Sequence, residues 1–411
     1  MRKFLRFLTQ RVVLTALLIV IQALLLFGII WKLNNYFVYF YAASVLLSLL
    51  LTLRIINNKS NPAFKIAWLI PILLFPVLGG LVYLVFGSDR TGKYIRNKMG
   101  RIEKEMQDGI SKANERSGIE KMPPDVVNQS HYISNSAHCP PYKNTTVEYL
   151  PMGEVKFERM VQELKKAKRY IFMEYFIIQE GTMWNTILDV LEEKAKEGVD
   201  VRVIYDDMGC ILTLPTGYEK TLREKGIQCQ IFNPFIPILS SHFNTRDHRK
   251  ICVIDGNVGF TGGINLADEY INGYEKHGHW KDTAILLKGE AVFSLTTMFL
   301  SMWDYLIKKE GEDYAAYYPD SWDENAQGIV QPFADNPLDD EAVGETVYLN
   351  LINKAKRYVY ITTPYLILSN EMVTAMNTAA KSGVDVRIIT PHVPDKWYVH
   401  AVSRSYYEML V

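Results

Sequence analysis

One segment of this chain occurs twice, about 185 residues apart, and this repetition limits the possible folds more than any other feature. KAKRYIFMEYFI at 166–177 returns as KAKRYVYITTPYLI at 354–367, and KEGVDVRVIYDD at 196–207 returns as KSGVDVRIITPH at 381–392. Each copy alternates β-rich apolar segments with helical patterns. Such β-α-β alternation predicts parallel strands with helices packed on them, so we expect an α/β fold with two homologous domains.

Three apolar segments precede the repeats. Residues 12–31 and 36–53 are each about as long as a bilayer-spanning helix and contain no charged side chain, so they predict two transmembrane helices. The length of the first and the lack of a small-residue cleavage site argue against a cleaved signal peptide. Two buried helices of a soluble core are the alternative interpretation, which such uninterrupted apolar runs do not favour.

The third apolar segment, 66–86, contains two prolines and a pair of glycines. Proline removes a helix donor and glycine loosens the backbone, so this segment either spans with a kink or enters and returns as a re-entrant hairpin. The flanks at 2–11, 54–65 and 90–104 are all basic. The positive-inside rule places all three in the cytoplasm only if the third segment is re-entrant. We therefore expect a multi-pass protein whose remaining chain lies on the cytoplasmic face.

The charge of the chain is balanced, with 45 Lys and Arg against 45 Asp and Glu, so no global field favours nucleic acid. The four cysteines have no metal-binding spacing and indicate free thiols. His277 and His279 lie near Asp282, but no third ligand is evident, so we expect no metal site. The charged stretch at 93–115 predicts a helix that contacts anionic lipid heads or serves as a plain spacer.

His248 and Lys250 begin the segment that bears on chemistry. The sequence at 249–263 predicts a β-hairpin, and two residues that are two apart on an extended chain face the same side. An imidazole beside an ammonium suits an anionic phosphorus centre, because the nitrogen can attack while the cation holds the oxygen atoms. A surface hairpin with a stray histidine is the alternative.

Two glycines and an asparagine follow at fixed spacing. Gly262 and Gly263 allow a close backbone approach, and their N–H groups lead into an expected helix start at Asn265, a favourable seat for an anion. Asp255 lies at the hairpin turn, where we expect it to orient the site rather than contact a substrate. The combined spacing makes a chance match very rare.

Glu174 interrupts an apolar strand, and a buried carboxylate needs a partner. A histidine or lysine of the site is one candidate partner. An exposed glutamate on an edge strand is the alternative.

The pattern H-x-K-x4-D-x6-G-G-x-N at 248–265 resembles the HKD motif of the phospholipase D superfamily. With the N-terminal apolar segments, FMEYFI at 172–177 and HWKDTAILLKGEAV at 279–292, the chain is similar to the bacterial cardiolipin synthases. The resemblance implies transmembrane helices followed by phospholipase D-like domains, each with a mixed sheet flanked by helices, in the bacterial cell membrane.

Five parts are expected along the chain. They are two transmembrane helices at 1–57, a third hydrophobic segment at 58–88, a charged linker at 89–145, a first phospholipase D-like domain with the motif at 146–335, and the start of a second such domain at 336–411.

The resemblance also implies a mechanism. In the family, two HKD copies meet at the domain interface, and one histidine attacks phosphatidylglycerol, forms a phosphohistidine and releases glycerol. A second phosphatidylglycerol then takes the phosphatidyl group, which gives cardiolipin. His248 would be the nucleophile, Asp255 would fix the geometry, and the implied phosphate-binding residues are Lys250, Gly262, Gly263 and Asn265. No metal or organic cofactor is implied.

The second copy has no counterpart of the motif within these 411 residues. The repeat offset places that counterpart near position 433, so we expect a second repeat that is cut off before its motif. His392 and His400 lack the x-Lys-x4-Asp continuation. We therefore expect little activity from this chain alone. Another phospholipase D-type hydrolase or phosphatidyltransferase, or an inactive membrane-bound fragment, are the alternatives, and nothing in the sequence indicates the oligomeric state.

Overall fold

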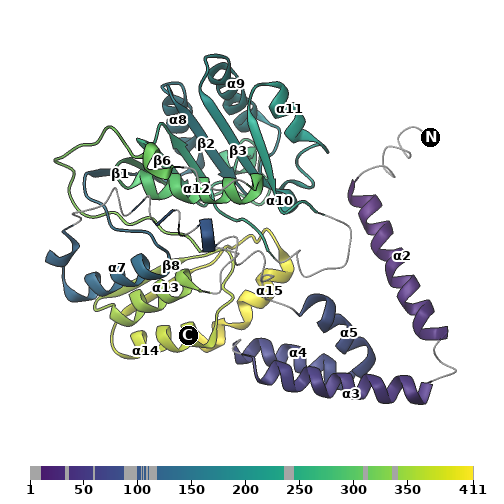
Figure 1. Cartoon of the computed structure of the whole chain (residues 1–411). Helices are drawn as coiled ribbons and strands as arrows, with labels where there is room; N and C mark the ends of the chain where they lie inside the picture. Colours follow the sequence, from purple (N-terminus) through teal and green to yellow (C-terminus); the bar gives the residue numbers. More distant parts are fainter. Residues whose placement is uncertain are drawn as a thin grey trace. The chain divides into compact units, whose positions relative to one another are not determined.

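The computed structural model describes residues 11–32, 37–58, 61–87, 118–235, 245–308, 313–335 and 341–410, with part of 100–110. Two compact units make up the chain (Figure 1). The first comprises Met1–Lys93 with Asn233–Arg246, and the second comprises Tyr94–Phe232 with Asp247–Val411. Most of the helix expected at 93–115 lies outside the described residues.

The described residues of the first unit form four apolar helices: α2 (Arg11–Lys32), α3 (Phe37–Ile56), α4 (Pro62–Leu74) and α5 (Pro76–Phe86). The third apolar segment is therefore two helices, which meet at Phe75 because proline ends one helix and readily begins the next. With 13 and 11 residues, α4 and α5 are about 20 and 16 Å long, and each is shorter than a bilayer core of about 30 Å.

Small residues hold α4 and α5 close together. A Cβ atom at Gly79 would lie 2.2 Å from the carbonyl oxygen of Pro71, so only glycine fits there. Gly80 faces Ser48 of α3, and the Ser48 hydroxyl donates a hydrogen bond of 2.9 Å to the carbonyl of Pro76. The glycine pair that predicted a loose backbone thus permits close helix packing.

Of the residues that the structure describes, one helix is long and apolar enough to cross a membrane, at Val38–Ile56. This finding supports a membrane-associated protein. The two-span and re-entrant arrangement, and the division into five parts, stay predictions.

A seven-stranded mixed sheet forms the centre of the second unit, with the order β1-β7-β6-β5-β2-β3-β4. Its strands are β1 (Thr145–Leu150), β2 (Tyr170–Tyr175), β3 (Asp200–Asp206), β4 (Gln228–Phe232), β5 (Ile251–Ile254), β6 (Val258–Gly262) and β7 (Ala284–Gly289). β2, β3 and β4 are parallel, and β5, β6, β7 and β1 are joined by antiparallel pairing. The predicted α/β class with a mixed sheet is confirmed.

Helices cover both faces of this sheet (Figure 1). The amphipathic helices α8 (Gly153–Leu164) and α9 (Thr182–Lys196) bury their apolar sides in one core with Ile171 and Met173 of β2. The apolar helix α12 (Val292–Ile307) lies in the other core, where its Phe299 stacks on Phe172 of β2 with ring centroids 4.7 Å apart. β2 alternates between the two cores, as the two-residue period of a strand requires.

The hairpin expected at 249–263 is present as β5 and β6, and β5 begins two residues later than expected. Asp255 and Gly256 form its turn with φ of 53° and 73°, a left-handed conformation that aspartate and glycine tolerate better than most residues.

The second repeat reproduces the β-α-β unit of the first. It consists of α13 (Val343–Lys354), β8 (Tyr358–Thr362), α14 (Asn370–Lys381) and β9 (Asp385–Ile389), followed by α15 (Trp397–Ser405) and α16 (Tyr407–Leu410). β8 pairs with β9 in the register that β2 uses with β3: Tyr358 is opposite Asp385, as Tyr170 is opposite Asp200. The predicted repetition is therefore structural as well as sequential.

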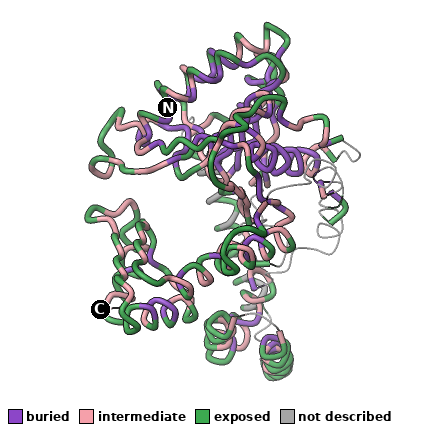
Figure 2. Tube along the Cα trace, turned by 90° about the vertical axis from the view of Figure 1, so that its left-hand side faces the viewer, coloured by how far each residue is buried: buried purple, intermediate pink, exposed green. Residues whose placement is uncertain are grey.

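The two copies differ in burial. Figure 2 shows the buried residues gathered around the first repeat, whereas the trace of the C-terminal repeat is mostly intermediate or exposed. Tyr358 and Tyr360, which correspond to Tyr170 and Phe172, are each 56% exposed. Within the described residues, β8 and β9 form a sheet of two strands, with no counterpart of α12 over them.

Candidate active site

His248 and Lys250 of the HKD pattern lie beyond one end of the strands of the seven-stranded sheet. At this end of the sheet, β2 and β3 finish side by side because they are parallel. β5 begins here because it is antiparallel to β2, and along the antiparallel strands β6 ends here and β7 begins here. Residues 247–250 lead into β5 as extended chain. His248 and Lys250 are therefore presented beside the end of β2.

The His248 side chain is exposed, and its ring lies against Phe176 with centroids 4.7 Å apart. The protein around the imidazole and the nearby ammonium of Lys250 both disfavour a positive charge, while Asp247 favours it. The balance lowers the pKa of His248 to about 4. Its imidazole is thus neutral at physiological pH and has a free electron pair for attack.

Lys250 is buried beside this histidine. Its Nζ donates a hydrogen bond of 2.6 Å to the His248 carbonyl and lies 5.6 Å from the ring centroid of Phe176. Burial lowers the pKa of Lys250 to about 8, while Asp247 and Asp282 oppose the shift. The amine remains mainly cationic at pH 7 and can bind an anion at low desolvation cost, because it is already stripped of water.

Glu174 is fully buried in β2, an interior strand, so the edge-strand interpretation is wrong. Its ion-pair partner is Arg249, whose Nη2 lies 2.5 Å from Glu174 Oε1. The expectation of a site histidine or lysine as partner is also wrong, because His248 and Lys250 point to the other face of the sheet from Arg249. Through its ion pair with Arg249, Glu174 contacts the motif segment on the face of the sheet opposite to His248.

The glycine and asparagine groups mostly serve the local fold. The N–H of Gly263 donates to the carbonyl of Thr283 at 3.1 Å. Asn265 accepts from the Ile177 N–H at 3.0 Å and donates to the Tyr270 hydroxyl at 2.8 Å. These bonds occupy the Gly263 donor and most of the Asn265 amide, which leaves Lys250 as the principal anion-binding group among the predicted ones.

The helix start expected at Asn265 is wrong. Leu266 bridges to Ile178, and the next helical element is the short 3₁₀ helix η4 (Asp268–Ile271). The glycines are required by close packing instead: a Cβ atom at Gly262 would lie 2.4 Å from the Thr283 oxygen, and one at Gly263 would lie 2.2 Å from Asp282 Oδ1.

Asp255 lies at the opposite end of β5 from His248. Its carboxylate accepts hydrogen bonds from the N–H groups of Lys168, Arg169 and Tyr170 at 2.9, 2.7 and 3.0 Å. The structure therefore does not bring Asp255 into contact with the reacting group. The orienting role expected for it can act only through the alignment of β5 against β2, so it is a positioning residue.

Comparison with known proteins identifies the family. Residues 160–303 and 348–411 match the family described as "Cardiolipin synthase, PLD-like domain", and 46–88 match "Phospholipase_D-nuclease N-terminal". A cardiolipin synthase of Geobacillus thermodenitrificans is 36% identical over 360 residues, which cover 86% of this chain and 71% of the relative. The chain belongs to the cardiolipin synthase family of the phospholipase D superfamily.

A further relative and a solved structure are also similar to this chain. A protein of Streptococcus mutans, itself uncharacterised, is 45% identical over 87% of this chain and 78% of its own length. Among solved structures, phosphatidylserine synthase of Haemophilus influenzae aligns over 68% of this chain and 71% of its own, with 15% identity and a TM-score of 0.46. Family membership indicates an enzyme of phospholipid metabolism.

Sequence reasoning missed two groups at the family's motif. Lys156 of α8 is fully buried, and its Nζ donates to the Ile264 carbonyl at 2.8 Å. Burial lowers the pKa of Lys156 to about 7. Asp282 packs on Gly263, and burial raises its pKa, while the ammonium groups of Lys156 and Lys250 oppose the shift. The described residues contain no cluster of three potential metal ligands.

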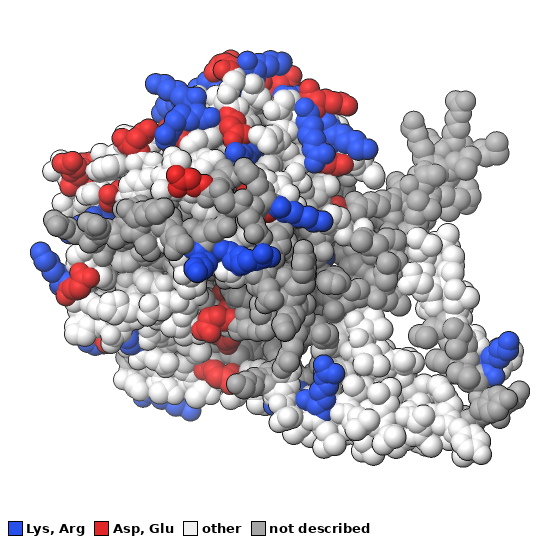
Figure 3. All heavy atoms as spheres, viewed as in Figure 1, with Lys and Arg blue, Asp and Glu red and all other residues white. Residues whose placement is uncertain are grey.

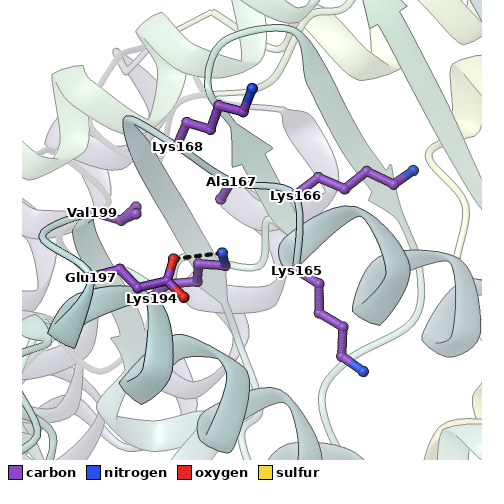
Figure 4. Close-up of a pocket in the computed structure, with 7 residues that line it drawn as sticks. All are labelled: Lys165, Lys166, Ala167, Lys168, Lys194, Glu197 and Val199. Atoms are coloured by element: carbon purple, nitrogen blue, oxygen red, sulfur yellow. Dashed lines mark hydrogen bonds and ion pairs between the residues drawn. The ribbon is translucent and has the colours of Figure 1, made fainter.

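A basic pocket lies at the other end of the strands. Lys165, Lys166 and Lys168 line it before β2 begins, and their side chains spread apart, while Lys194 pairs with Glu197 at 2.7 Å (Figure 4). These ammonium groups do not converge on one point. Because the pocket lies before β2 begins and His248 lies where β2 ends, the two are separate.

Replacement of Lys250 by methionine tests the charge coupling at this site. Lys250→Met removes a cation that opposes protonation of His248, so the pKa of His248 should rise from about 4 by about 1 unit. The pH dependence of diethyl pyrocarbonate modification at His248, followed by peptide mass spectrometry, measures this shift. Lys288→Met removes a cation near the far end of β7 and should leave the titration unchanged. An unchanged His248 titration in Lys250→Met would contradict the coupling.

Asp255→Ala separates positioning from chemistry. The change removes the acceptor of three backbone N–H groups, so we expect a loss of about 1–3 kcal/mol in unfolding free energy with an unchanged pKa at His248. Asp255→Asn keeps one acceptor oxygen and tolerates the positive φ, and it should lose less. Denaturant unfolding and the same titration measure both effects. A shifted titration at full stability would instead point to direct action of Asp255.

Proposed function

We propose that His248 is the nucleophile of a phosphatidyl transfer from phosphatidylglycerol. The observation that carries this proposal is an exposed imidazole, neutral at physiological pH, beside the buried ammonium of Lys250. Membership of the cardiolipin synthase family supports the choice of substrate. Phosphatidylglycerol is an anionic lipid, which suits a site whose principal binding group is a cation.

The first step forms a bond between an imidazole nitrogen of His248 and phosphorus. The bond from phosphorus to the headgroup oxygen breaks, and glycerol leaves after its oxygen takes a proton from an acid. In the second step the hydroxyl of another phosphatidylglycerol attacks, the phosphorus–nitrogen bond breaks, and the hydroxyl proton passes to a base. The products are cardiolipin and glycerol. Lys250 binds the phosphate oxygens while negative charge builds on them.

The acid and base come from a second histidine in our proposal. These 411 residues contain one H-x-K-x4-D pattern, and His392 and His400 do not continue it. General acid–base help is typically worth about 10²–10⁴-fold in rate. We therefore propose that the chain assayed alone transfers phosphatidyl groups slowly or not at all.

The partner of this site is membrane lipid rather than nucleic acid in our proposal. Positive and negative side chains are interspersed on the face shown in Figure 3, and the chain has equal numbers of both. A nucleic-acid site would favour a basic stripe. We also propose that α2 and α3 span the cell membrane, that α4 and α5 form a re-entrant hairpin, and that the catalytic domain faces the cytoplasm.

Thin-layer analysis of lipids after incubation with phosphatidylglycerol vesicles tests the reaction. Any cardiolipin and glycerol from chain 1–411 should form at a rate at least about 10²–10⁴-fold below that of the Geobacillus thermodenitrificans enzyme assayed in parallel. His248→Gln, which preserves a polar side chain of similar size, should abolish the product. Phosphatidic acid would identify water as the acceptor, and full-rate cardiolipin from His248→Gln would refute the proposed nucleophile.

Reporter fusions test the membrane arrangement. A reporter placed just after Gly87 should give a cytoplasmic signal, as should one at the N-terminus, whereas one between α2 and α3 should give an external signal. The reason is that α4 and α5 are each too short to cross the bilayer. An external signal after Gly87 would show that the third segment spans the membrane.

A further inference from the structure

A buried ion cluster lies directly behind the proposed nucleophile. Glu174 is 0% exposed and Asp247 is 3% exposed, and both contact the guanidinium of Arg249. The distances are 2.5 Å from Arg249 Nη2 to Glu174 Oε1 and 3.0 Å from Arg249 Nε to Asp247 Oδ1. Two carboxylates therefore hold the side chain of the residue that separates His248 from Lys250.

The direction of each side chain follows from the strand pairing. Glu174 is opposite Ile251 in the register of β2 and β5, and Ile251 belongs to the core beneath α12. Successive residues of an extended chain alternate between faces, so Arg249 and Asp247 share the face of Ile251. His248 and Lys250 take the other face, where Cys252 lies in the core of α8 and α9.

The same segment is also tied to the neighbouring strand. The N–H of Asp247 donates to Asp206 Oδ2 at 3.1 Å, and Asp206 Oδ1 accepts from the N–H groups of Met208 and Gly209 at 2.9 and 3.1 Å. Residues 247–250 precede the first ladder pair of β5, so the ladder alone does not fix them. Arg249 joins them to β2, and Asp247 joins them to β3.

We propose that Arg249 is a positioning residue for His248: its guanidinium, clamped by Glu174 and Asp247, fixes the segment so that the imidazole and the Lys250 ammonium face the substrate together. The inference rests on the proposed role of His248 as nucleophile. A one-residue slip of this segment would exchange the two faces and bring Arg249 to the reaction side.

The two carboxyl groups of the cluster have pKa values shifted in opposite directions. Burial beside Asp247 raises the pKa of Glu174 well above its ordinary value, and the Arg249 guanidinium lowers the pKa of Asp247. The upward shift favours the protonated form of Glu174, and in that form the three side chains together carry no net charge. Such a cluster stabilises a fold little compared with apolar packing, but its directional bonds can specify one arrangement.

The test measures the titration of His248 in the full chain, in detergent, by diethyl pyrocarbonate modification and peptide mass spectrometry. Arg249→Met should raise the pKa of His248 by about 1 unit, because a loosened segment lets the imidazole move away from the Lys250 ammonium, which opposes its protonation. Arg249→Lys should produce a smaller rise. Glu174→Met should resemble Arg249→Met, whereas Glu174→Gln, which matches the protonated acid in shape and hydrogen bonding, should titrate like the unchanged protein.

His131 of α7 (Pro124–Ser136), an exposed histidine outside the cluster, serves as the internal control. A structural effect alone would alter His131 and His248 together, and that result would overturn the proposal. If Arg249→Met fails to fold, Arg249→Lys and Glu174→Met decide the question. An unchanged His248 titration in both folded variants would also overturn it. Because no lipid turnover is measured, a failure of phosphatidyl transfer and a failure of this inference remain distinguishable.

Discussion

The mixed pairing of β2 is the constraint on which the site depends. β2 is parallel to β3 on one side and antiparallel to β5 on the other, so the end of β2 meets the beginning of β5 at one edge of the sheet. An all-parallel arrangement would place the beginning of β5 at the far edge, where Asp255 now lies. The ring of His248 can contact the ring of Phe176 because β5 is antiparallel to β2.

Charge at this edge is organised in two layers. The layer beside the proposed reaction centre holds the ammonium groups of Lys250 and Lys156, and burial depresses the pKa of each. The layer behind it holds Arg249 with two carboxylates. The sheet backbone separates the layers, so the forward side remains attractive to a phosphate while the carboxyl groups offset the guanidinium charge at the rear. An isolated cation at the rear would compete for the same anion.

Much of the fold could be predicted from local patterns. The β-α-β alternation, the hairpin at β5 and β6, and the common side of His248 and Lys250 depend on periods within a few residues. The helix start expected at Asn265 is absent because Asn265 bonds to Ile177, a contact between segments 88 residues apart. Glu174 and Arg249 meet only after β2 and β5 pair. The burial of Lys156 likewise depends on where α8 packs. The spacing of residues within α8 does not predict that position.

The open face of β8 and β9 has a consequence for how this polypeptide behaves in solution. Tyr358, Tyr360 and Ile389 are 56, 56 and 62% exposed on a two-stranded sheet whose outer edges are unpaired among the described residues. Aromatic surface beside free strand edges attracts other chains and detergent alike. The face of β8 and β9 thus offers purified material a surface for self-association, even if every apolar helix at the other end were shielded by lipid.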